Sequence, residues 1–411
     1  MYKGLPKGIY ALFFARIINS MGAFVFPFLT IFLTRNLGLD EKTAGSIVMI
    51  GAFFSVPGSF LGGFLSDYIG RKKIIILAQG LAALCFVPCA FLEDSMIIPV
   101  LLMSSNFFAG IARPATTAMT TDLTNKDNRK AAFSLIYLGI NIGFSIGPLI
   151  AGFLYNNYIE LIFLGDAFTT LLSLIFVYKY VDETKPTEKE IEDSKVSDNT
   201  QEKAEEGSLV AVLLKRPNLI FFGIASVVYS FVFAQHGFSL PLQTESIFNN
   251  DLSTEVFGTL MATNGIVVVL MTVFLIDLTK KLKPLLNIAM AGILCGIGFG
   301  MIYYVSSIKL LILSTVIWTL GEILNATNTG VYIANHTPIS HRGRFNSIFP
   351  IITGAGFALS PRIMGSFINL NGIRAVWPLI FCLSMIGALL MFLLYVWEKT
   401  KKQKVYEKKE V

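Results

Sequence analysis

One carboxylic acid lies near the middle of a long apolar stretch in the second half of the chain. Glu322 is accompanied there by Trp318, Asn325 and Thr329, which fall on the same helical face at i−4, i+3 and i+7. A charge in hydrocarbon is costly, so such a side chain usually faces a cavity or a partner. A buried carboxyl of this kind can bind and release a proton, with Trp318 and Asn325 lining the same cavity. The alternative is a structural glutamate that is hydrogen-bonded to a neighbouring helix.

Three arginines also lie inside apolar stretches. Arg113 shares a helical face with Asn106 and is expected to face a cavity, where it would bind a solute or take part in coupling. Arg16 is assigned to the same cavity but lies near enough to the end of its stretch to reach water, and packing is favoured for Arg362. Because these cations outnumber the acids in the stretches, an anionic, zwitterionic or neutral substrate remains open. Four further polar side chains are assigned to the cavity, although the histidine among them could instead be a helix contact: Tyr137, Asn141, Tyr229 and His236.

An acid, glycines and cations mark the loop between two apolar stretches. The residues fit the spacing G-x-x-x-D-x-x-G-R-[KR], and Asp67 and Arg71 stand at i and i+4, which suits a local ion pair. A basic loop between two membrane helices would explain the cations but not the spacing of the acid and the glycines. The residues that fit are Gly63, Asp67, Gly70, Arg71 and Lys72.

This loop resembles the signature loop of the major facilitator superfamily of transporters. The resemblance implies that Asp67 pairs with neighbouring helix ends and with Arg71, holding the cytoplasmic side closed, and Asp122 is a plausible third gate residue. It also implies two parallel six-helix repeats, with the substrate site at their interface near the membrane midplane.

A second motif lies in the stretch 131–155. The sequence GINIGFSIGPLIAG resembles, imperfectly, a pattern shared by the antiporter branches of the superfamily, which implies efflux. Alternatively, small residues at four-residue spacing simply allow membrane helices to pack closely. The motif residues are Gly143, Gly147, Pro148 and Gly152.

The helix around Glu322 adds to the resemblance. The sequence TLGEI, Thr319 to Ile323, resembles the same helix of proton-coupled multidrug antiporters and, more distantly, of peptide transporters, which implies a coupling or substrate role for Glu322. Two departures weaken the likeness. Asn106 stands where the antiporter branch often has arginine, and the stretch with Tyr137 and Asn141 lacks the acid that some relatives carry there.

The elements that position these residues follow from composition. Of 411 residues, 54% are hydrophobic and only 15% charged, which is typical of an integral membrane protein. Because about 20 apolar residues span a bilayer, the chain is predicted to be all-α, with twelve transmembrane helices in two six-helix bundles. The predicted spans are 8–34, 43–65, 73–92, 96–121, 131–155, 160–180, 218–244, 253–276, 284–305, 308–335, 345–369 and 375–397.

Charge placement predicts the orientation. Nearly all Lys and Arg outside the spans fall in segments on the side of the N-terminus, which places both termini in the cytoplasm. The net charge of +6 is then a topology signal rather than a nucleic-acid footprint. The opposite loops hold only Arg35, Lys42, Lys309 and Arg374, and the four cysteines show no metal-type clustering.

A charged segment divides the chain, and the two halves repeat. At an offset of 213, Arg129, Gly143 and Pro148 match Arg342, Gly356 and Pro361 in the second half. The predicted domains are an N-terminal bundle over 1–181, a cytoplasmic linker over 182–217, a C-terminal bundle over 218–398 and a basic tail over 399–411.

The sequence contains no Walker-type loop, metal-spaced cluster or nucleophile elbow, so neither an ATP-driven pump nor an enzyme is predicted. The first hypothesis is a proton-coupled exporter of drugs or other small amphipathic molecules, which works by alternating access. The alternatives are proton-coupled uptake of a small polar solute such as a peptide or sugar, and a lipid flippase. The expected partners are a small-molecule substrate, protons and membrane lipid. No cofactor beyond the proton gradient is expected, and the chain is predicted to be a monomer in the cell membrane.

Overall fold

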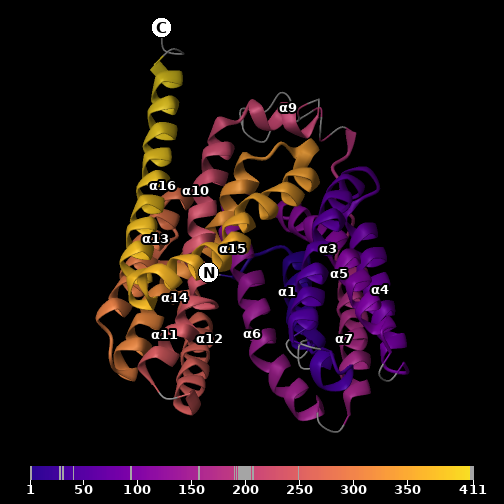
Figure 1. The fold of residues 1–411 in the computed structure, drawn as a ribbon. Helices are drawn as coiled ribbons and strands as arrows, with labels where there is room; N and C mark the ends of the chain where they lie inside the picture. Colours follow the sequence, from indigo (N-terminus) through magenta and orange to yellow (C-terminus); the bar gives the residue numbers. More distant parts are fainter. Residues whose placement is uncertain are drawn as a thin grey trace. The chain divides into compact units, whose positions relative to one another are not determined.

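The protein is described here from a computed structural model in which the described part of the chain is helical, without strands (Figure 1). Long runs of Leu, Ile, Phe and Ala form helices because a helix satisfies every backbone N–H and C=O internally, as an apolar surrounding requires. The described residues are 2–26, 29, 32–39, 41–92, 95–155, 158–188, 190, 192, 205, 208–248 and 250–407.

The described residues of the first half form six long helices and a short π-helical segment, followed by a short helix before the second half. They are α1 (Lys7–Met21), η1 (Phe32–Asn36), α3 (Glu41–Tyr68), α4 (Arg71–Cys89), α5 (Ile97–Asp122), α6 (Arg129–Tyr155), α7 (Ile159–Tyr180) and α9 (Leu209–Leu214).

The second half is built in the same way, with proline at the start of two helices, where its missing N–H is not needed. Its elements are α10 (Pro217–Phe233), η2 (Ala234–His236), α11 (Ser239–Ile247), α12 (Asn250–Thr279), α13 (Pro284–Met301), η3 (Ile302–Tyr304), α14 (Ile308–His336), η4 (Ile339–His341), α15 (Arg342–Asn371), η5 (Ile373–Ala375) and α16 (Val376–Glu407).

Ten helical segments of the described residues are long and apolar enough to cross a membrane. The all-α fold class is therefore confirmed, whereas the count of twelve spans and the orientation of the termini stay predictions. The predicted spans 8–34 and 43–65 are not among the ten; span 8–34 includes residues outside the described part, and several side chains of span 43–65, which lies within α3, are not described.

The seventh predicted span, 218–244, is interrupted. Helix α10 ends at Phe233, and a short 3₁₀ turn precedes Ser239, where α11 begins. The side chain of Gln235 fills this break: its amide donates to Ser360 Oγ at 2.6 Å, and Ser239 Oγ donates to its Oε1 at 2.6 Å. These bonds show how an interrupted membrane helix satisfies its polar groups within the protein.

The first predicted span, 8–34, is also interrupted, at the end of α1. The helix ends at Met21, and the backbone N–H of Val25 then donates to Asp166 Oδ2 of α7 at 3.2 Å. The Asp166 side chain is buried, so its carboxylate holds the backbone that follows α1. This contact accounts for an acid within a span without requiring an ion pair with an arginine.

By its internal contacts the chain divides into two units, which we describe separately. The N-terminal unit holds Tyr2–Leu209 together with Thr337–Ile348, and the C-terminal unit consists mainly of Val210–His336 and Phe349–Val411. In the N-terminal unit α1 packs on α6 and α7, while α5 packs on α3 and α4. In the C-terminal unit α13 packs on α14 and α16, while α12 packs on α14. The predicted domain boundaries themselves stay a proposal.

The repeat predicted from the sequence has a structural counterpart at two helix starts. Arg129 is the first residue of α6, and Arg342, its match at an offset of 213, is the first residue of α15. Both side chains are buried. The Arg129 guanidinium donates to the carbonyl of Thr124 at 3.1 Å, so it closes the end of the preceding helix.

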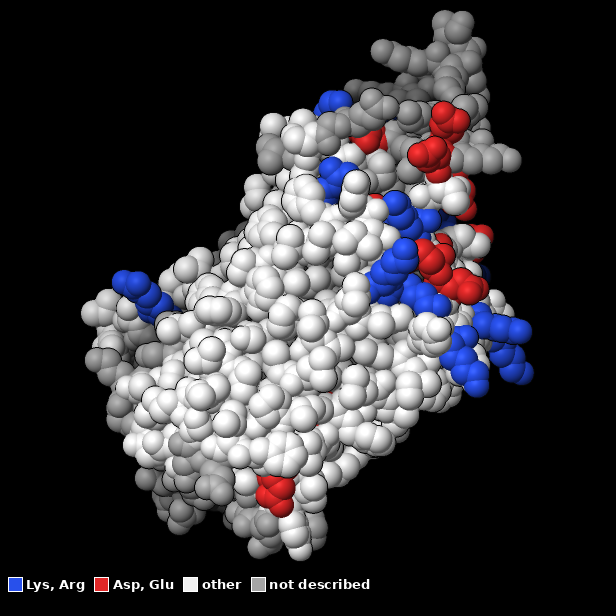
Figure 2. Space-filling model, turned by 90° about the vertical axis from the view of Figure 1, so that its right-hand side faces the viewer, with Lys and Arg blue, Asp and Glu red and all other residues white. Residues whose placement is uncertain are grey.

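Charged side chains are unevenly distributed over the surface. The face in Figure 2 is largely free of them, and most of the Lys, Arg, Asp and Glu side chains in view gather along one border. Large apolar side chains are well exposed on α4 and α7, among them Leu77 and Phe168, at 60% and 65%. An exposed apolar surface of this kind fits contact with lipid rather than with water.

Candidate functional site

Glu322 lies in α14, where its carboxylate meets a side chain of the neighbouring helix α12. Asn264 Nδ2 donates to Glu322 Oε2 at 2.7 Å and to Thr319 Oγ1 at 3.0 Å. The Thr319 hydroxyl in turn donates to the carbonyl of Thr315 at 2.6 Å, which directs its lone pairs towards the amide. The polar helix face predicted around Glu322 thus becomes a cluster that joins two helices; we call Asn264, Thr319 and Glu322 the Glu322 cluster.

An aromatic wall lies one turn before Glu322. The Trp318 indole is fully buried and stacks on Phe299 of α13, with ring centroids 5.4 Å apart. The imidazole of His236, from the break between α10 and α11, lies 5.9 Å from the same indole, and its Nδ1 is 2.6 Å from the carbonyl of Phe233. The Trp318 Nε1 atom is buried without a hydrogen-bond partner among the described residues. Trp318 and His236 therefore lie side by side, and their assignment to a substrate cavity stays a prediction.

Two other residues assigned to this region lie differently. Asn325 is half-buried on α14 and accepts a hydrogen bond from Thr329 Oγ1 at 3.2 Å. Tyr229 is buried, and its hydroxyl donates to the carbonyl of Ile288 at 2.7 Å, where the ring packs against Gly387 of α16. Tyr229 thus ties α10 to α13 and α16, and we leave it out of the proposed site.

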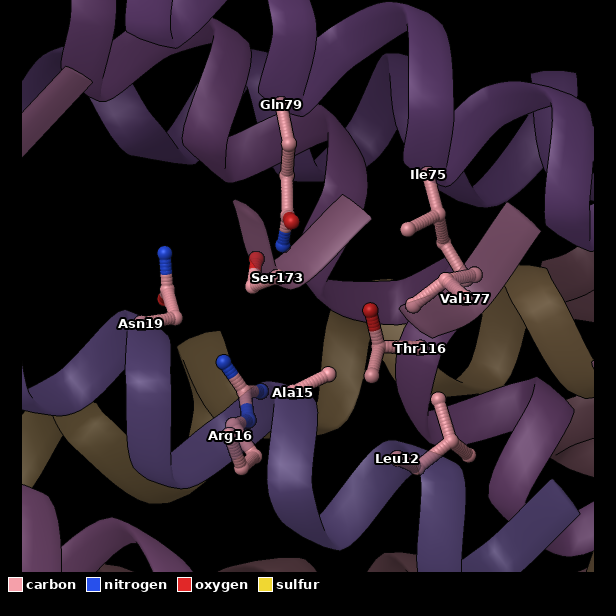
Figure 3. A pocket seen from close by; sticks show the side chains of 9 residues that line it. All are labelled: Leu12, Ala15, Arg16, Asn19, Ile75, Gln79, Thr116, Ser173 and Val177. Carbon is pink, nitrogen blue, oxygen red and sulfur yellow. The ribbon is translucent and has the colours of Figure 1, made fainter. Parts of the chain in front are cut away.

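The polar residues assigned to the first half lie on several helices of the N-terminal unit. Arg113 on α5 has an exposed side chain, and Asn106, two turns earlier, is half-buried. Asn141 on α6 donates to the carbonyl of Tyr137 at 2.9 Å, so its amide is engaged by its own helix. Arg16 on α1 lines a small pocket together with Gln79 of α4 (Figure 3).

The signature-loop residues form a buried ion network. Asp67 at the end of α3 pairs with Arg71 at 3.0 Å, as the i and i+4 spacing predicted, and Arg71 also reaches Asp122 at 3.0 Å. The side chain of Arg71 is only 1% exposed, so the two carboxylates provide its charge compensation. The third gate residue proposed from the sequence, Asp122, is therefore part of the same network.

The segment Thr337–Ile348 completes this network. Arg342 Nη1 lies 2.7 Å from Asp122, and Arg344 Nε lies 3.3 Å from Asp67. Asp67 also accepts the backbone N–H of Gly343 at 2.9 Å and that of Arg344 at 3.1 Å, at the N-terminus of α15. The carboxylate thus meets the positive end of a helix dipole as well as two guanidinium groups. We call Asp67, Arg71, Asp122, Arg342 and Arg344 the ion network.

The glycines of the signature loop allow close approaches. A Cβ atom on Gly63 would stand 2.5 Å from Ser347 Oγ, and one on Gly343 would stand 2.5 Å from the Gly63 carbonyl. Gly70 has φ of 126°, which side-chain-bearing residues rarely adopt, and it precedes the first residue of α4. The last residue of the signature loop, Lys72, contacts α7: its Nζ donates to the carbonyl of Tyr178 at 2.8 Å.

The antiporter-like motif lies where α6 packs on α1. A Cβ atom on Gly143 would clash with Ser20 and stand 2.7 Å from the Ile17 carbonyl, and one on Gly147 would stand 2.7 Å from the Met21 carbonyl. These glycines let the two helix backbones touch near the point where α1 ends. Pro148 and Gly152 belong to the same helix, but their surroundings lie outside the described part.

Comparison with known sequences decides the family. The profile of the Major Facilitator Superfamily matches residues 12–329 and 290–411. The chain belongs to the major facilitator superfamily. It is therefore a secondary transporter and a multi-pass integral membrane protein, not an enzyme.

Relatives in the superfamily cover nearly the whole chain. An uncharacterized MFS-type transporter, YttB, of Bacillus subtilis (strain 168) is 25% identical over 90% of this chain and 91% of its own length. A Na(+), Li(+), K(+)/H(+) antiporter of Planococcus maritimus is 24% identical over 88% of this chain and 92% of its own. The crystal structure of the human organic anion transporter MFSD10 (TETRAN) superposes with a TM-score of 0.74 at 16% identity, covering 94% of this chain and 99% of that one.

Sequence reasoning missed three residues that complete the sites of this superfamily member. Asn264 lies in an apolar span, where a polar side chain could have been identified from the sequence as a candidate site residue. Arg344 was not assigned to the gate, because its pairing with Asp67 joins segments far apart in the chain. Glu183 was treated as linker, yet its Oε1 accepts the backbone N–H groups of Arg71 at 2.7 Å and Lys72 at 3.3 Å, at the start of α4.

We expect the substitution Gly143→Val to destabilise the transporter by about 1–3 kcal/mol, because the added side chain overlaps the α1 backbone. Thermal unfolding of the purified protein measures this. Gly80→Val is the matched control, since a Cβ at Gly80 has no neighbour within 4 Å. Equal unfolding temperatures for the two variants would contradict a close α1–α6 contact.

Proposed function

We propose that this transporter exports small amphipathic molecules, such as drugs, in exchange for protons. The observation that carries the proposal is the Glu322 cluster: an acid within a membrane-spanning helix, hydrogen-bonded at 2.7 Å to Asn264. The 24% identical cation/proton antiporter of Planococcus maritimus supports exchange as the mode of transport. The cell membrane as the location and a monomeric state are parts of the same proposal.

In this mechanism the proton on Glu322 and the substrate compete. When the carboxylate is charged, Asn264 donates to it, and the same amide also reaches Thr319. A proton on the carboxyl weakens this charge-assisted bond and frees the amide to turn towards Thr319 alone. The indole of Trp318 next to the cluster is fully buried, so a substrate would reach its apolar surface only in a state in which the surrounding helices separate. Binding of one species thus opposes binding of the other, as exchange requires.

The ion network would act as the gate of the same cycle. It attaches the start of α15, a helix of the second half, to the ends of α3 and α5. Alternating access requires that such contacts form in one state and break in another. When the contact opens, water can solvate the charged side chains in place of their ion-pair partners. The network therefore suits a closure that forms and breaks reversibly.

Everted membrane vesicles test the direction of exchange. Respiration acidifies their lumen and quenches a pH-sensitive dye, after which ethidium, norfloxacin, benzoate, a dipeptide or K⁺ is added. Antiport predicts that at least one compound restores fluorescence by releasing protons from vesicles that contain the protein, and not from vesicles that lack it. Deeper quenching on addition of the dipeptide, which would report protons entering the lumen together with it, would instead establish symport and overturn the proposal.

A further inference from the structure

A buried acid of α7 lies where the chain leaves α1. Asp166 is only 6% exposed, and residues beside it, Phe163 of α7 and Phe24 and Val25 of the segment after α1, belong to one apolar cluster. Its Oδ2 atom accepts the backbone N–H of Val25 at 3.2 Å, across 141 positions of the chain. The proposed proton exchange does not use this acid. An ionisable group in such a position is a candidate functional residue, because its charge is costly there.

Asp166 has no charged partner among the described residues. The groups that act on its carboxylate there are backbone N–H groups of the segment after α1. Of the helices that pack on α7, α1 brings Arg16 beside Ser173, about two turns away along α7, and α4 brings the thiol of Cys89 into the same apolar cluster. The charged residues of α4 and α6 lie in the first turn of each helix, away from this cluster. Within the described part of the chain, hydrogen bonds rather than ion pairs hold the carboxylate.

The segment that Asp166 holds rests directly on α7. A Cβ atom on Gly22, the residue after α1, would overlap the hydroxyl of Thr169, so the backbone leaves no room for a side chain at this point. The backbone N–H groups of residues 22–24 donate to carbonyls of residues 18–22. That of Val25 donates to Asp166 instead. The carboxylate therefore supplies the hydrogen bond that ties the end of this segment to α7.

We propose that Asp166 is a second proton-binding residue of the transporter and that its proton controls the backbone after α1. The carboxylate accepts the Val25 N–H in a charge-assisted bond, and a proton on the carboxyl leaves only a weaker, neutral acceptor. The segment then loosens, while α1 stays attached to α7 through Asn19, whose amide donates to Thr170 Oγ1 at 3.1 Å. The proposal goes beyond exchange at Glu322: it rests on the proposed function for its link to transport, but not for proton binding.

Hydrogen–deuterium exchange of the full-length protein in nanodiscs, at mildly alkaline and mildly acidic pH, tests the site. After correction for the intrinsic effect of pH on exchange, we expect the protection of segment 22–25 to fall by about tenfold at the acidic pH, because a charge-assisted bond becomes a neutral one. Asp166→Asn keeps an acceptor but cannot be protonated, so its protection should be equal at both pH values. Glu160→Gln, which changes an exposed acid of the same helix, is the matched control and should respond as the native protein does.

Protection of the segment that does not change with pH in the native protein would overturn the proposal, as would a pH response that persists in Asp166→Asn. Infrared spectra add a readout that does not require this variant to fold. The carbonyl band of a protonated carboxylic acid should appear in the native protein over the same pH change, and its absence would overturn the proposal. Glu322→Gln should keep both responses, so a failure of proton exchange at Glu322 is distinguishable from a failure of this site. Loss of both responses in Glu322→Gln would assign the proton to Glu322 and contradict a site at Asp166.

Discussion

We expect the substitution Glu322→Gln to abolish proton-coupled transport while leaving the protein folded. Glutamine preserves the shape and can still accept the hydrogen bond from Asn264, but it cannot carry a proton through the cycle. Substrate-driven proton movement should therefore fall more than about tenfold, to the level of vesicles without the protein. Exchange of labelled for unlabelled substrate, which needs no net proton transfer, should persist.

The control for this variant is Glu160→Gln, which changes an exposed acid at the start of α7. Both variants should melt within a few degrees of the native protein. If Glu322→Gln moves protons as the native protein does, the coupling acid lies elsewhere and Glu322 is a structural residue between α12 and α14. If the variant unfolds instead, Asn264→Ala, which removes the partner but keeps the acid, should retain proton movement with an altered pH dependence.

The second large effect is expected from Asp67→Asn. The substitution removes a charge from the ion network and leaves the buried guanidinium of Arg71 with Asp122 alone. Breaking a buried ion pair in this way costs about 3–5 kcal/mol, which a fall in the unfolding temperature would report. Transport should fall as well, because Arg344 and the start of α15 lose their charged acceptor.

The chain contains a matched control for this prediction. Asp277 lies in the last turn of α12, but it is 57% exposed and pairs only with Lys280 at 2.9 Å among the described residues. Asp277→Asn should therefore change stability by less than about 0.5 kcal/mol. Equal destabilisation by the two substitutions would show that burial of the network has no energetic role.

Much of the helical framework could be predicted from the sequence. Charged loops bound the apolar runs closely enough that the predicted spans 160–180 and 308–335 differ from α7 and α14 by one residue at an end. The interruption at Gln235 could not be predicted in this way. Gln235, His236 and Gly237 make the sequence polar at this point, but polarity alone does not distinguish a break from a polar helix face, and one of the bonds that stabilise the break comes from Ser360, more than 100 residues away.

The residues of the candidate sites also divide into local contacts, which the sequence predicts, and contacts between distant segments, which it does not. The spacing of Asp67 and Arg71 revealed a local ion pair, since both residues lie within two turns of the chain. The pairing of Asp122 with Arg342 depends instead on how two distant segments pack, and periodicity carries no such information. The role of Glu183 was hidden for a related reason: a charged residue at the start of a polar segment has the composition of a linker, whether or not it binds a helix end.

The most direct test of proton-coupled export is proton movement driven by substrate alone. Proteoliposomes with an internal pH dye are loaded with the compound that gave the largest response in everted vesicles, at equal pH inside and outside. As the compound leaves, antiport through Glu322 predicts that the lumen acidifies with the native protein and not with Glu322→Gln. Alkalinisation of the lumen, or loss of the compound without any pH change, would contradict the account.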